Sequence, residues 1–468
     1  SGPRAECFTK ATTFIMISIA GIFLFASIFV VFGVLNYTSW SSQLHMPRHF
    51  TQLLEITFIC FLLYVMKQLA QVSVLPMPET FDCEWLTAML REKGAMRYSN
   101  SINSITGEQQ LTGGCHSAVR KMELSFREQS DWLPPAIVVK VLKWNKSFYE
   151  RVCLAARAAL PDRFETKEVC YLKSYSIEAK FYRDIGPEVH GIKIPRVYYN
   201  HNDKFNNEFG MIMEDITFRD NKEAVPITGQ PLGFTFAETR RILSQLAHFH
   251  AWFWEHPDLL KYDVWSVAGY YTDTKRTIFK DKVEDHWSNV LQNLGSELNL
   301  TGMESFGARL YNNRKALNSV YKHSKLKTIV HGDYKISNIF LDRRTATQTK
   351  AKYSHHSDSV YVIDWQWVGL GIGAVDVAYY LATSTVLDTV QKSSMKKLVK
   401  LYHSILVEKG VKNYTFKEMW MDFRLAFVDF VVYVISCKWT AMMPSDFLSN
   451  QAQLKDGLHI RSLVHAKQ

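Results

Sequence analysis

The chain has 468 residues and carries 55 Lys and Arg against 45 Asp and Glu, which gives a net charge of +10. Hydrophobic residues make up 47% and charged residues 21%, a balance that excludes a disordered chain, and the length predicts two or three domains. Seven scattered cysteines without a CxxC pair exclude a dense disulfide framework and favour a reducing compartment. No dense Lys/Arg run or nucleic-acid module occurs, so we expect no nucleic-acid partner.

The first 80 residues predict a membrane-anchoring region followed by a linker. No Asp, Glu, Lys or Arg occurs from Ala11 to Pro47, and Phe14 to Leu35 is almost wholly apolar, long enough to span a bilayer of about 30 Å. The alternative for this run is a buried core helix. A shorter apolar run from Ile56 to Met66 predicts a second span, a re-entrant piece or a helix at the interface.

Strand-like segments dominate after the linker and helical segments dominate later. We expect an amphipathic helix over 80–94, strands over 118–124, 136–142 and 208–216, and a helix over 174–186. From about Phe236 the apolar spacing is helical, interrupted by a loop near His331 and a strand over 360–363. Strands in one part and helices in the next indicate a two-lobed α+β domain.

The segment IVHGDYKISNIF, residues 329–340, contains the clearest chemical signal. Asp333 follows His-Gly, Asn338 stands five positions later, and Asp364 ends the strand that follows, 26 positions after Asn338. An isolated HGD could equally be a turn with an Asp cap. Together, the three side chains match a phosphoryl-transfer set, in which Asp333 deprotonates the acceptor hydroxyl while Asn338 and Asp364 hold Mg²⁺ against ATP.

Phosphate-binding groups are expected upstream, in the order that this chemistry needs. Gly113 and Gly114, with Ser117 shortly after them, predict a loop that covers the phosphates, although a simple turn is the alternative. Lys140 lies inside the apolar strand AIVVKVL, where a buried ammonium needs an anionic partner. Glu178, on the following helix, is the best partner; the alternative is a surface ion pair.

The segment EFGMIMEDI, residues 208–216, predicts a hinge that binds adenine. The carbonyl of Glu214 and the N–H of Ile216 would form the hydrogen bonds, and Met213 would close the back of the pocket.

Three further polar residues have supporting roles in this interpretation. Asp376, in GAVDVAYYL, is expected to brace the catalytic loop from a buried position, with a helix N-cap as the alternative. His248 and His250 are expected to pack near the acceptor pocket rather than bind metal, because no third ligand has suitable spacing.

These motifs resemble a known family. HGDYKISNIF with VIDWQ resembles the aminoglycoside/choline phosphotransferase group of kinase-like folds, and IEAKFY, MEDI, LAHFHAWFW, IDWQ and DVAYYL are most similar to its ecdysteroid-kinase-like branch. The likeness covers roughly residues 105–400. It implies a protein-kinase-like fold with a small sheet-rich N-lobe and a large helical C-lobe. It also implies the roles given above for Asp333, Asn338, Asp364 and Lys140.

Two departures qualify the resemblance. Cys115 and His116 are bulky residues after the glycine pair, which puts the phosphate grip of that loop in doubt. The chain has HGD and DWQ where protein kinases have HRD and DFG, and it lacks a convincing APE, so a protein substrate is not expected.

The sequence therefore predicts an anchoring region over 1–80, an N-lobe over 81–217 and a C-lobe over 218–468. The predicted function is an ATP-dependent, Mg²⁺-dependent kinase for a small-molecule alcohol, held at a membrane with the kinase facing the cytosol. A sterol-like alcohol is the preferred acceptor; a choline-like or aminoglycoside-like alcohol is the first alternative. A membrane-tethered pseudokinase scaffold is the second.

Overall fold

The structure is a computed structural model, and the residues that it describes leave out the N-terminal region. The described residues are 78, 80–111, 118–130, 133–143, 167–203, 208–219, 223–224, 233–257, 259, 279–296, 300–321, 325–341, 360–386 and 392–445. The apolar runs Phe14–Leu35 and Ile56–Met66, and with them the predicted anchor, lie outside this set. Among the helices that can be described, none is both long and apolar enough to cross a bilayer.

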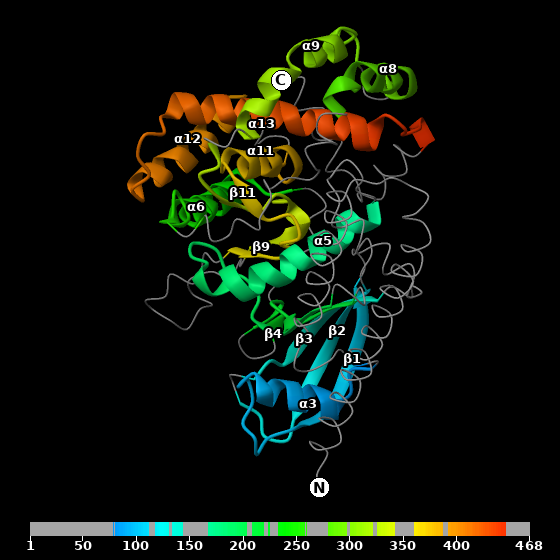
Figure 1. The fold of residues 1–468 in the computed structure, drawn as a ribbon, viewed down its shortest axis with the longest axis vertical. Helices are drawn as coiled ribbons and strands as arrows, with labels where there is room; N and C mark the ends of the chain where they lie inside the picture. Colours follow the sequence, from blue (N-terminus) through cyan, green and yellow to red (C-terminus); the bar gives the residue numbers. More distant parts are fainter. Residues whose placement is uncertain are drawn as a thin grey trace, which may run out of the picture. The chain divides into compact units, whose positions relative to one another are not determined.

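A five-stranded antiparallel sheet forms the N-terminal part of the described chain (Figure 1). Its strand order is β1 (Ile102–Leu111), β2 (Ala118–Phe126), β3 (Ala136–Lys143), β5 (Glu208–Glu214) and β4 (Val197–Asp203). The sequence predicted β2, β3 and β5 but neither edge strand. An edge strand is paired and covered on fewer sides than a central one, so its apolar pattern is weak. The mostly polar β1, INSITGEQQL, shows this directly.

Helices cover both faces of this sheet. On one face, α3 (Cys83–Glu92) packs Leu86, Met89 and Leu90 against buried side chains that include Ile137 and Val139 of β3. Because side chains alternate along a strand, Lys140 points to the opposite face, where α5 (Lys167–Lys180) lies. The alternation therefore turns Lys140 away from the α3 core and toward α5.

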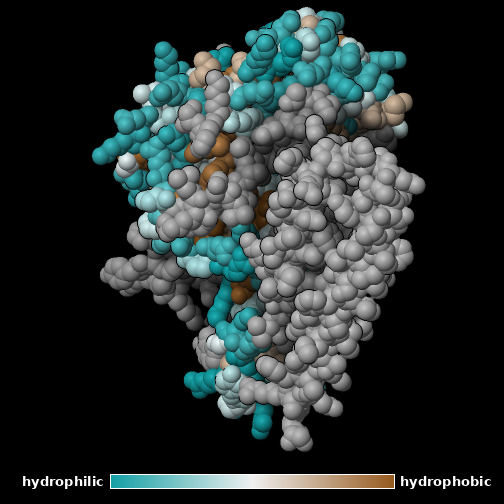
Figure 2. Space-filling model, in the orientation of Figure 1, coloured by the Kyte–Doolittle hydropathy of each residue, from teal (hydrophilic) through white to brown (hydrophobic). Residues whose placement is uncertain are grey.

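The C-terminal part is mainly helical. Its helices are α6 (Phe236–Trp252), α8 (Val283–Leu294), α9 (Phe306–Asn312), α10 (Arg314–Leu317), α11 (Ala374–Thr383), α12 (Lys392–Glu408) and α13 (Phe416–Val434). Here α6 packs against α12 and α11 packs against α13. Capping boxes begin α6 at Thr235 and α13 at Thr415. Hydrophilic residues, teal in Figure 2, cover the surface around α8 and α9.

Short two-stranded pairs lie between these helices in the chain, and the loops that contain the predicted site residues connect to them. Strand β8 (Thr328–Val330) pairs with β11 (Gly369–Gly371), and β9 (Ile339–Leu341) pairs with β10 (Val360–Val362). A two-residue pair, β6 (Phe218–Arg219) and β7 (Glu223–Ala224), follows the large sheet. The expected division into a sheet-rich N-terminal part and a helical C-terminal part is confirmed, and the described residues from 78 to 445 all belong to one compact unit. The boundary at 217/218 stays a prediction.

Candidate active site

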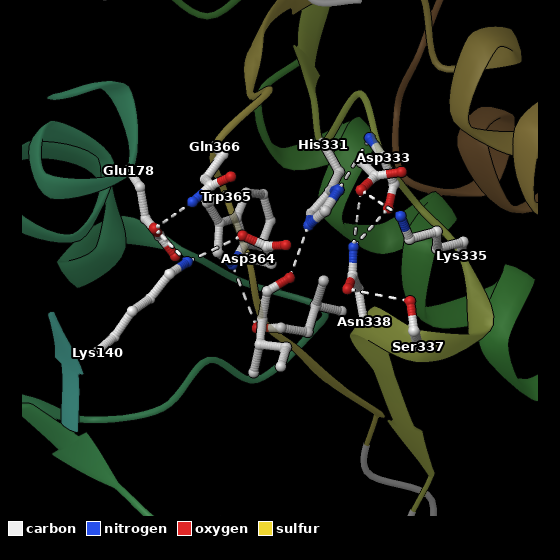
Figure 3. Close-up of polar contacts among 12 residues, drawn as sticks. Lys140, Glu178, His331, Asp333, Lys335, Ser337, Asn338, Asp364, Trp365 and Gln366 are labelled. Atoms are coloured by element: carbon white, nitrogen blue, oxygen red, sulfur yellow. Dashed lines mark hydrogen bonds and ion pairs between the residues drawn. The ribbon is translucent and has the colours of Figure 1, made fainter. Parts of the chain in front are cut away.

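Lys140 lies at the centre of an ion-pair network that joins the sheet, α5 and the strand end after β10 (Figure 3). Its Nζ is 2.7 Å from Oε2 of Glu178 and 3.1 Å from Oδ1 of Asp364. The predicted pairing with Glu178 is therefore present. Burial by itself would lower the pKa of the Lys140 ammonium, but the carboxylates of Asp364 and Glu178 outweigh burial and raise it above its ordinary value. The ammonium stays charged and is held by two carboxylates from different elements.

Asp364 is the accessible member of this network. Its side chain is 32% exposed, whereas that of Glu178 is fully buried. Burial would raise the pKa of the Asp364 carboxyl, but Lys140 first, and then Lys335 and His331, hold it below its ordinary value. The carboxylate is therefore ionised and open to a ligand.

The backbone at Asp364 is in the left-handed region, with φ of +66°. Residues with a Cβ occupy this region rarely, Asp more often than most, and the neighbouring structure must hold Asp364 in place at a cost in free energy. The next residue, Trp365, is fully buried; its ring stacks on Phe181 with centroids 3.9 Å apart and contacts the His331 ring at 4.6 Å. The Trp365 indole N–H also donates to the carbonyl of Val362 at 3.2 Å. The buried Trp365 side chain thus anchors the turn that presents Asp364.

The sequence analysis did not identify Gln366. Its side-chain amide donates to Oε2 of Glu178 at 3.4 Å, so the segment that carries Asp364 also contacts the partner of Lys140. Its position two residues after Asp364 places Gln366 close to the site, but a single Gln in a sequence does not reveal which residue it will contact.

Asp376 braces the HGD loop, as the sequence predicted. Its carboxylate accepts the backbone N–H of His331 at 2.7 Å and that of Gly332 at 2.9 Å, while Gly373, rather than Asp376, occupies the N-cap of α11. Gly332 has φ of +79°, and a Cβ there would collide with the carbonyl of Trp367. The loop conformation therefore depends on a buried carboxylate and on glycine.

His250, which the sequence analysis placed near the acceptor pocket, belongs to this support of the HGD loop. The ring is fully buried, with Nε2 3.3 Å from Oδ2 of Asp376 and Nδ1 2.7 Å from the hydroxyl of Tyr402. Helical spacing placed His250 on the inward face of α6 but did not reveal what that face meets. His248 is only partly buried, and burial followed by nearby Lys409 lowers the pKa of its imidazole.

The two oxygens of Asp333 have different surroundings. Oδ2 lies 2.9 Å from Nζ of Lys335 and accepts Nδ2 of Asn338 at 3.2 Å, and the same Nδ2 donates to the Asp333 carbonyl at 3.0 Å. Oδ1 is buried and has no hydrogen-bond partner in the described part of the chain. A carboxylate with one oxygen held and the other available is suited to accept a hydroxyl proton. Lys335 is a second residue that the sequence analysis did not identify.

Asn338 and Asp364 are brought close by the β9–β10 pair. The backbone N–H of Ile363, which precedes Asp364, donates to the carbonyl of Asn338 at 3.0 Å. Oδ1 of Asn338 accepts a long bond of 3.4 Å from Ser337. One carboxylate and one amide oxygen fit Mg²⁺, which commonly takes one or two protein ligands and completes its shell with phosphate oxygens and water. No cluster of three His, Cys, Asp or Glu metal ligands occurs among the described residues.

The predicted adenine hinge follows β5. The N–H of Glu214 donates to the carbonyl of Arg196 at 2.9 Å, and its side chain accepts the N–H of Arg196 at 3.0 Å. Asp215 accepts the N–H of Thr217 at 2.8 Å and pairs with Lys121 at 2.8 Å, which fixes the chain around Ile216. The adenine-binding roles of Glu214 and Ile216 stay predictions.

The predicted phosphate-covering loop cannot be compared with the structure. Gly113, Gly114 and Ser117 lie outside the described residues, so their roles stay predictions.

Comparisons with known proteins place this site in a family context. The model of the ecdysteroid kinase-like family matches residues 158–413, more than half of the chain, and this range contains Glu178, Asp333, Asn338 and Asp364. No curated protein sequence matches the chain significantly.

The solved structures that are similar to the chain include two aminoglycoside phosphotransferase complexes and an ethanolamine kinase. The GDP complex of wild-type aminoglycoside 2'-phosphotransferase-IIIa is 12% identical with a TM-score of 0.40, covering 80% of this chain and 97% of its own. The streptomycin–ATP–APH(2")-IIa complex is 15% identical with a TM-score of 0.35, covering 81% and 99%. Plasmodium vivax ethanolamine kinase is 10% identical with a TM-score of 0.33, covering 82% and 90%.

Proposed function

The chain belongs to the ecdysteroid kinase-like family of small-molecule phosphotransferases, and we propose that it transfers the γ-phosphoryl group of ATP to a hydroxyl of a small molecule. One observation carries this proposal. Oδ1 of Asp333 is buried and has no hydrogen-bond partner among the described residues, while the loop that presents it also holds Asn338 beside Asp364. Such an arrangement places a proton acceptor on one side of a metal–phosphate site.

In the proposed reaction, Oδ1 of Asp333 accepts the proton of the acceptor hydroxyl. The hydroxyl oxygen then forms a bond to the γ-phosphorus, the bond from that phosphorus to the β–γ bridging oxygen breaks, and ADP leaves with the electron pair. Lys140 binds the α- and β-phosphates from the position in which Glu178 holds it. Asn338 and Asp364 are the residues that would hold Mg²⁺, and the bound ion would supply positive charge against the phosphates of ATP.

Replacement of the proton acceptor tests this mechanism. Asp333→Asn keeps the shape of the side chain but removes the base, so turnover should fall by about 10²- to 10⁴-fold. Binding of Mg·ATP, measured by calorimetry, should stay within about twofold because the carboxylate faces the acceptor. Asp281→Asn, at an exposed surface pair, is the matched control. Near-normal turnover of Asp333→Asn would remove Asp333 from the catalytic role.

A sterol-like alcohol is the acceptor that we favour. The support is the family itself, together with an apolar N-terminal region that would bring the kinase close to lipophilic substrates. Mg·ATP turnover should be measured with sterols, amino alcohols and aminoglycosides in parallel. Preference for choline-like or aminoglycoside-like alcohols would overturn the sterol assignment and keep the kinase.

The pseudokinase alternative predicts a different result from the same panel. A scaffold would show no turnover with any acceptor and would tolerate loss of the site residues. The joint presence of Lys140, Glu178, Asp333, Asn338 and Asp364 supports catalysis, because a scaffold has no need for all five.

We place the kinase on the cytosolic side of a membrane, held by residues 1–80. Cytosolic ATP and the apolar run Phe14–Leu35 support this location, with Ile56–Met66 completing a helical hairpin or lying on the surface. A tag before residue 1 in sealed microsomes distinguishes the two: cleavage by added protease indicates the hairpin, and protection indicates a single span. Glycosylation at Asn145, Asn299 or Asn413 would contradict a cytosolic kinase altogether.

A further inference from the structure

We infer that Lys121 is a positioning residue that fixes the nucleotide-binding hinge and makes it selective for adenine over guanine. This role rests on the proposed kinase function. Lys121 is on β2, and its Nζ lies 2.8 Å from Oδ2 of Asp215, the residue between Glu214 and Ile216. The Lys121 side chain is 16% exposed and that of Asp215 is 4% exposed, so salt screens this pair only weakly.

The sheet places Lys121 on the same face as Lys140. Met122, the next residue on β2, is buried in the α3 core, so alternation turns Lys121 to the opposite face. Lys121 lies opposite Val138 of β3, and Val138 lies opposite Met213 of β5. Because residues directly opposite each other point to the same face, these three residues form one row that ends beside the hinge.

Asp215 is fixed by its backbone and by both carboxylate oxygens. Its N–H donates to the carbonyl of Ala136 at 3.2 Å, at the beginning of β3. Oδ1 accepts the N–H of Thr217 at 2.8 Å and the hydroxyl of Thr217 at 2.6 Å, while Oδ2 pairs with Lys121. The Lys121 ammonium also lies 3.5 Å from the Thr217 hydroxyl. These contacts tie the hinge to β2 and β3 and fix the turn that follows it.

The next residue of the hinge has a donor that is available to a ligand. Ile216 is buried, yet its backbone N–H has no hydrogen-bond partner in the part of the chain that the structure describes. Buried N–H groups nearly always have a partner, and a bound base supplies one here. The ion pair of Lys121 therefore fixes the residue that adjoins the unpaired donor.

A fixed backbone register explains why adenine is preferred. Adenine presents its 6-amino donor beside the N1 acceptor, an order that matches the carbonyl of Glu214 followed by the N–H of Ile216. Guanine presents the reverse order, the O6 acceptor beside the N1–H donor. To bind guanine in the same place, the hinge must shift until an N–H stands where the Glu214 carbonyl now stands. Lys121 opposes this shift because it holds Asp215, the residue in between.

The competing interpretation is that Lys121 only neutralises the buried Asp215. If the ion pair only stabilises the fold, its loss should leave the ratio of adenine to guanine nucleotide affinity unchanged. If it fixes the hinge, that ratio should fall, and the affinity for a ligand without a base should stay the same.

Calorimetry on the full chain should compare the magnesium complexes of AMP-PNP and GMP-PNP, non-hydrolysable analogues of ATP and GTP, with that of inorganic tripolyphosphate, which has no base. Lys121→Met should weaken AMP-PNP binding by about 5- to 30-fold and change GMP-PNP and tripolyphosphate binding by less than about twofold. Lys121→Arg should recover part of the AMP-PNP affinity because it keeps the charge.

Arg120→Met is the matched control on the same strand. Arg120 pairs at the surface with Glu108, so its loss should change the affinity for none of the three ligands. If Lys121→Met does not fold, Lys121→Met combined with Asp215→Asn removes both charges of the pair and should give the same pattern.

Equal losses of AMP-PNP and GMP-PNP affinity, a parallel loss of tripolyphosphate affinity, or no loss of AMP-PNP affinity would overturn the role of Lys121. An unmodified chain that binds GMP-PNP as well as AMP-PNP, or better, would also overturn it. Absence of any Mg-nucleotide binding by the unmodified chain would instead overturn the proposed function. The two failures are therefore distinguishable in one set of titrations.

Discussion

Two buried lysines, Lys280 and Lys140, show how an ion pair in a ligand-binding site differs from one that only stabilises the fold. Lys280, just before α8, has Nζ 2.6 Å from Oδ1 of Asp429 and 2.6 Å from Oδ1 of Asn318. The hydroxyl of Tyr321 donates to the other oxygen of Asp429 at 2.6 Å. The Lys280 and Asp429 side chains are each 2% exposed. Every charge in this cluster has a partner in the chain, and none faces solvent.

The Lys140 network differs from the Lys280 cluster because one of its carboxylates is accessible to solvent. Glu178 is as buried as Asp429, but Asp364 is one-third exposed and strained in its backbone. A buried Lys–carboxylate pair is therefore not by itself evidence of chemistry. An accessible carboxylate in the same network is the feature that indicates a ligand, because a closed pair has no charge left to offer.

The largest expected effect is the loss of stability when Lys280, the lysine with a purely structural role, is replaced. Lys280→Met leaves the buried Asp429 charge without its cation, so the free energy of unfolding should fall by about 3–5 kcal/mol. Catalytic turnover per folded molecule should not change. Urea denaturation and activity at a temperature where the variant is folded measure the two quantities. Glu108→Gln, at the exposed pair with Arg120, should cost less than about 1 kcal/mol. If Lys280→Met were stable but inactive, the distinction between the structural Lys280 cluster and the ligand-binding Lys140 network would be wrong.

Lys140→Met should show the reverse pattern. Loss of the phosphate-binding ammonium should lower turnover by about 10²- to 10³-fold, as for other preorganised electrostatic contacts. It should also weaken Mg·ATP and Mg·ADP together, because both nucleotides carry the α- and β-phosphates. Pairing it with Glu178→Gln removes the carboxylate that would otherwise stay buried and unpaired. Unchanged affinity for both nucleotides would require another phosphate-binding residue.

The smallest effect concerns the support beneath the HGD loop. Tyr402→Phe removes the hydrogen bond to His250, and at pH 7 it should cost about 1 kcal/mol of stability. Burial first, and then Asp376, raise the pKa of the Tyr402 hydroxyl well above its ordinary value.

The contribution of Tyr402 is therefore fully present below the unfolded pKa of about 10 and declines as the pH rises above it. By pH 11 the stability of the unmodified protein relative to Tyr402→Phe should have fallen by about 1.4 kcal/mol, which cancels or reverses the difference of about 1 kcal/mol at pH 7. Urea denaturation of both proteins at pH 7 and pH 11 measures this difference in the free energy of unfolding. Tyr98→Phe, at a 71% exposed side chain, should show no such change. A constant difference between the two pH values would show that the hydroxyl titrates normally.

Much of the site was predictable from local sequence. The apolar strand around Lys140 required a buried partner, and Glu178 on the next helix supplies it. The spacing of Asp333, Asn338 and Asp364 predicted that a loop and a strand end lie side by side. The pairing of β9 with β10 brings them together. These features could be inferred because strand alternation and loop chemistry act over a few residues.

The edge strand β1 was not predictable, because its mostly polar residues carry little apolar pattern. The contacts of His250 were not predictable for a related reason: helical spacing identifies an inward face but not the element that the face meets. Gln366 and Lys335 have ordinary polar sequence contexts, and their roles depend on partners that only folding brings near.

The sequence by itself determined the family, the order of the lobes and the identity of the acid, amide and ammonium groups. The tertiary structure decided which of those groups meet. Asp376 and His331 are separated by 45 positions, and Lys140 and Asp364 by 224, yet both pairs are bonded. Such contacts depend on how helices and strands pack, and periodicity within one segment contains no information about the neighbour across the core.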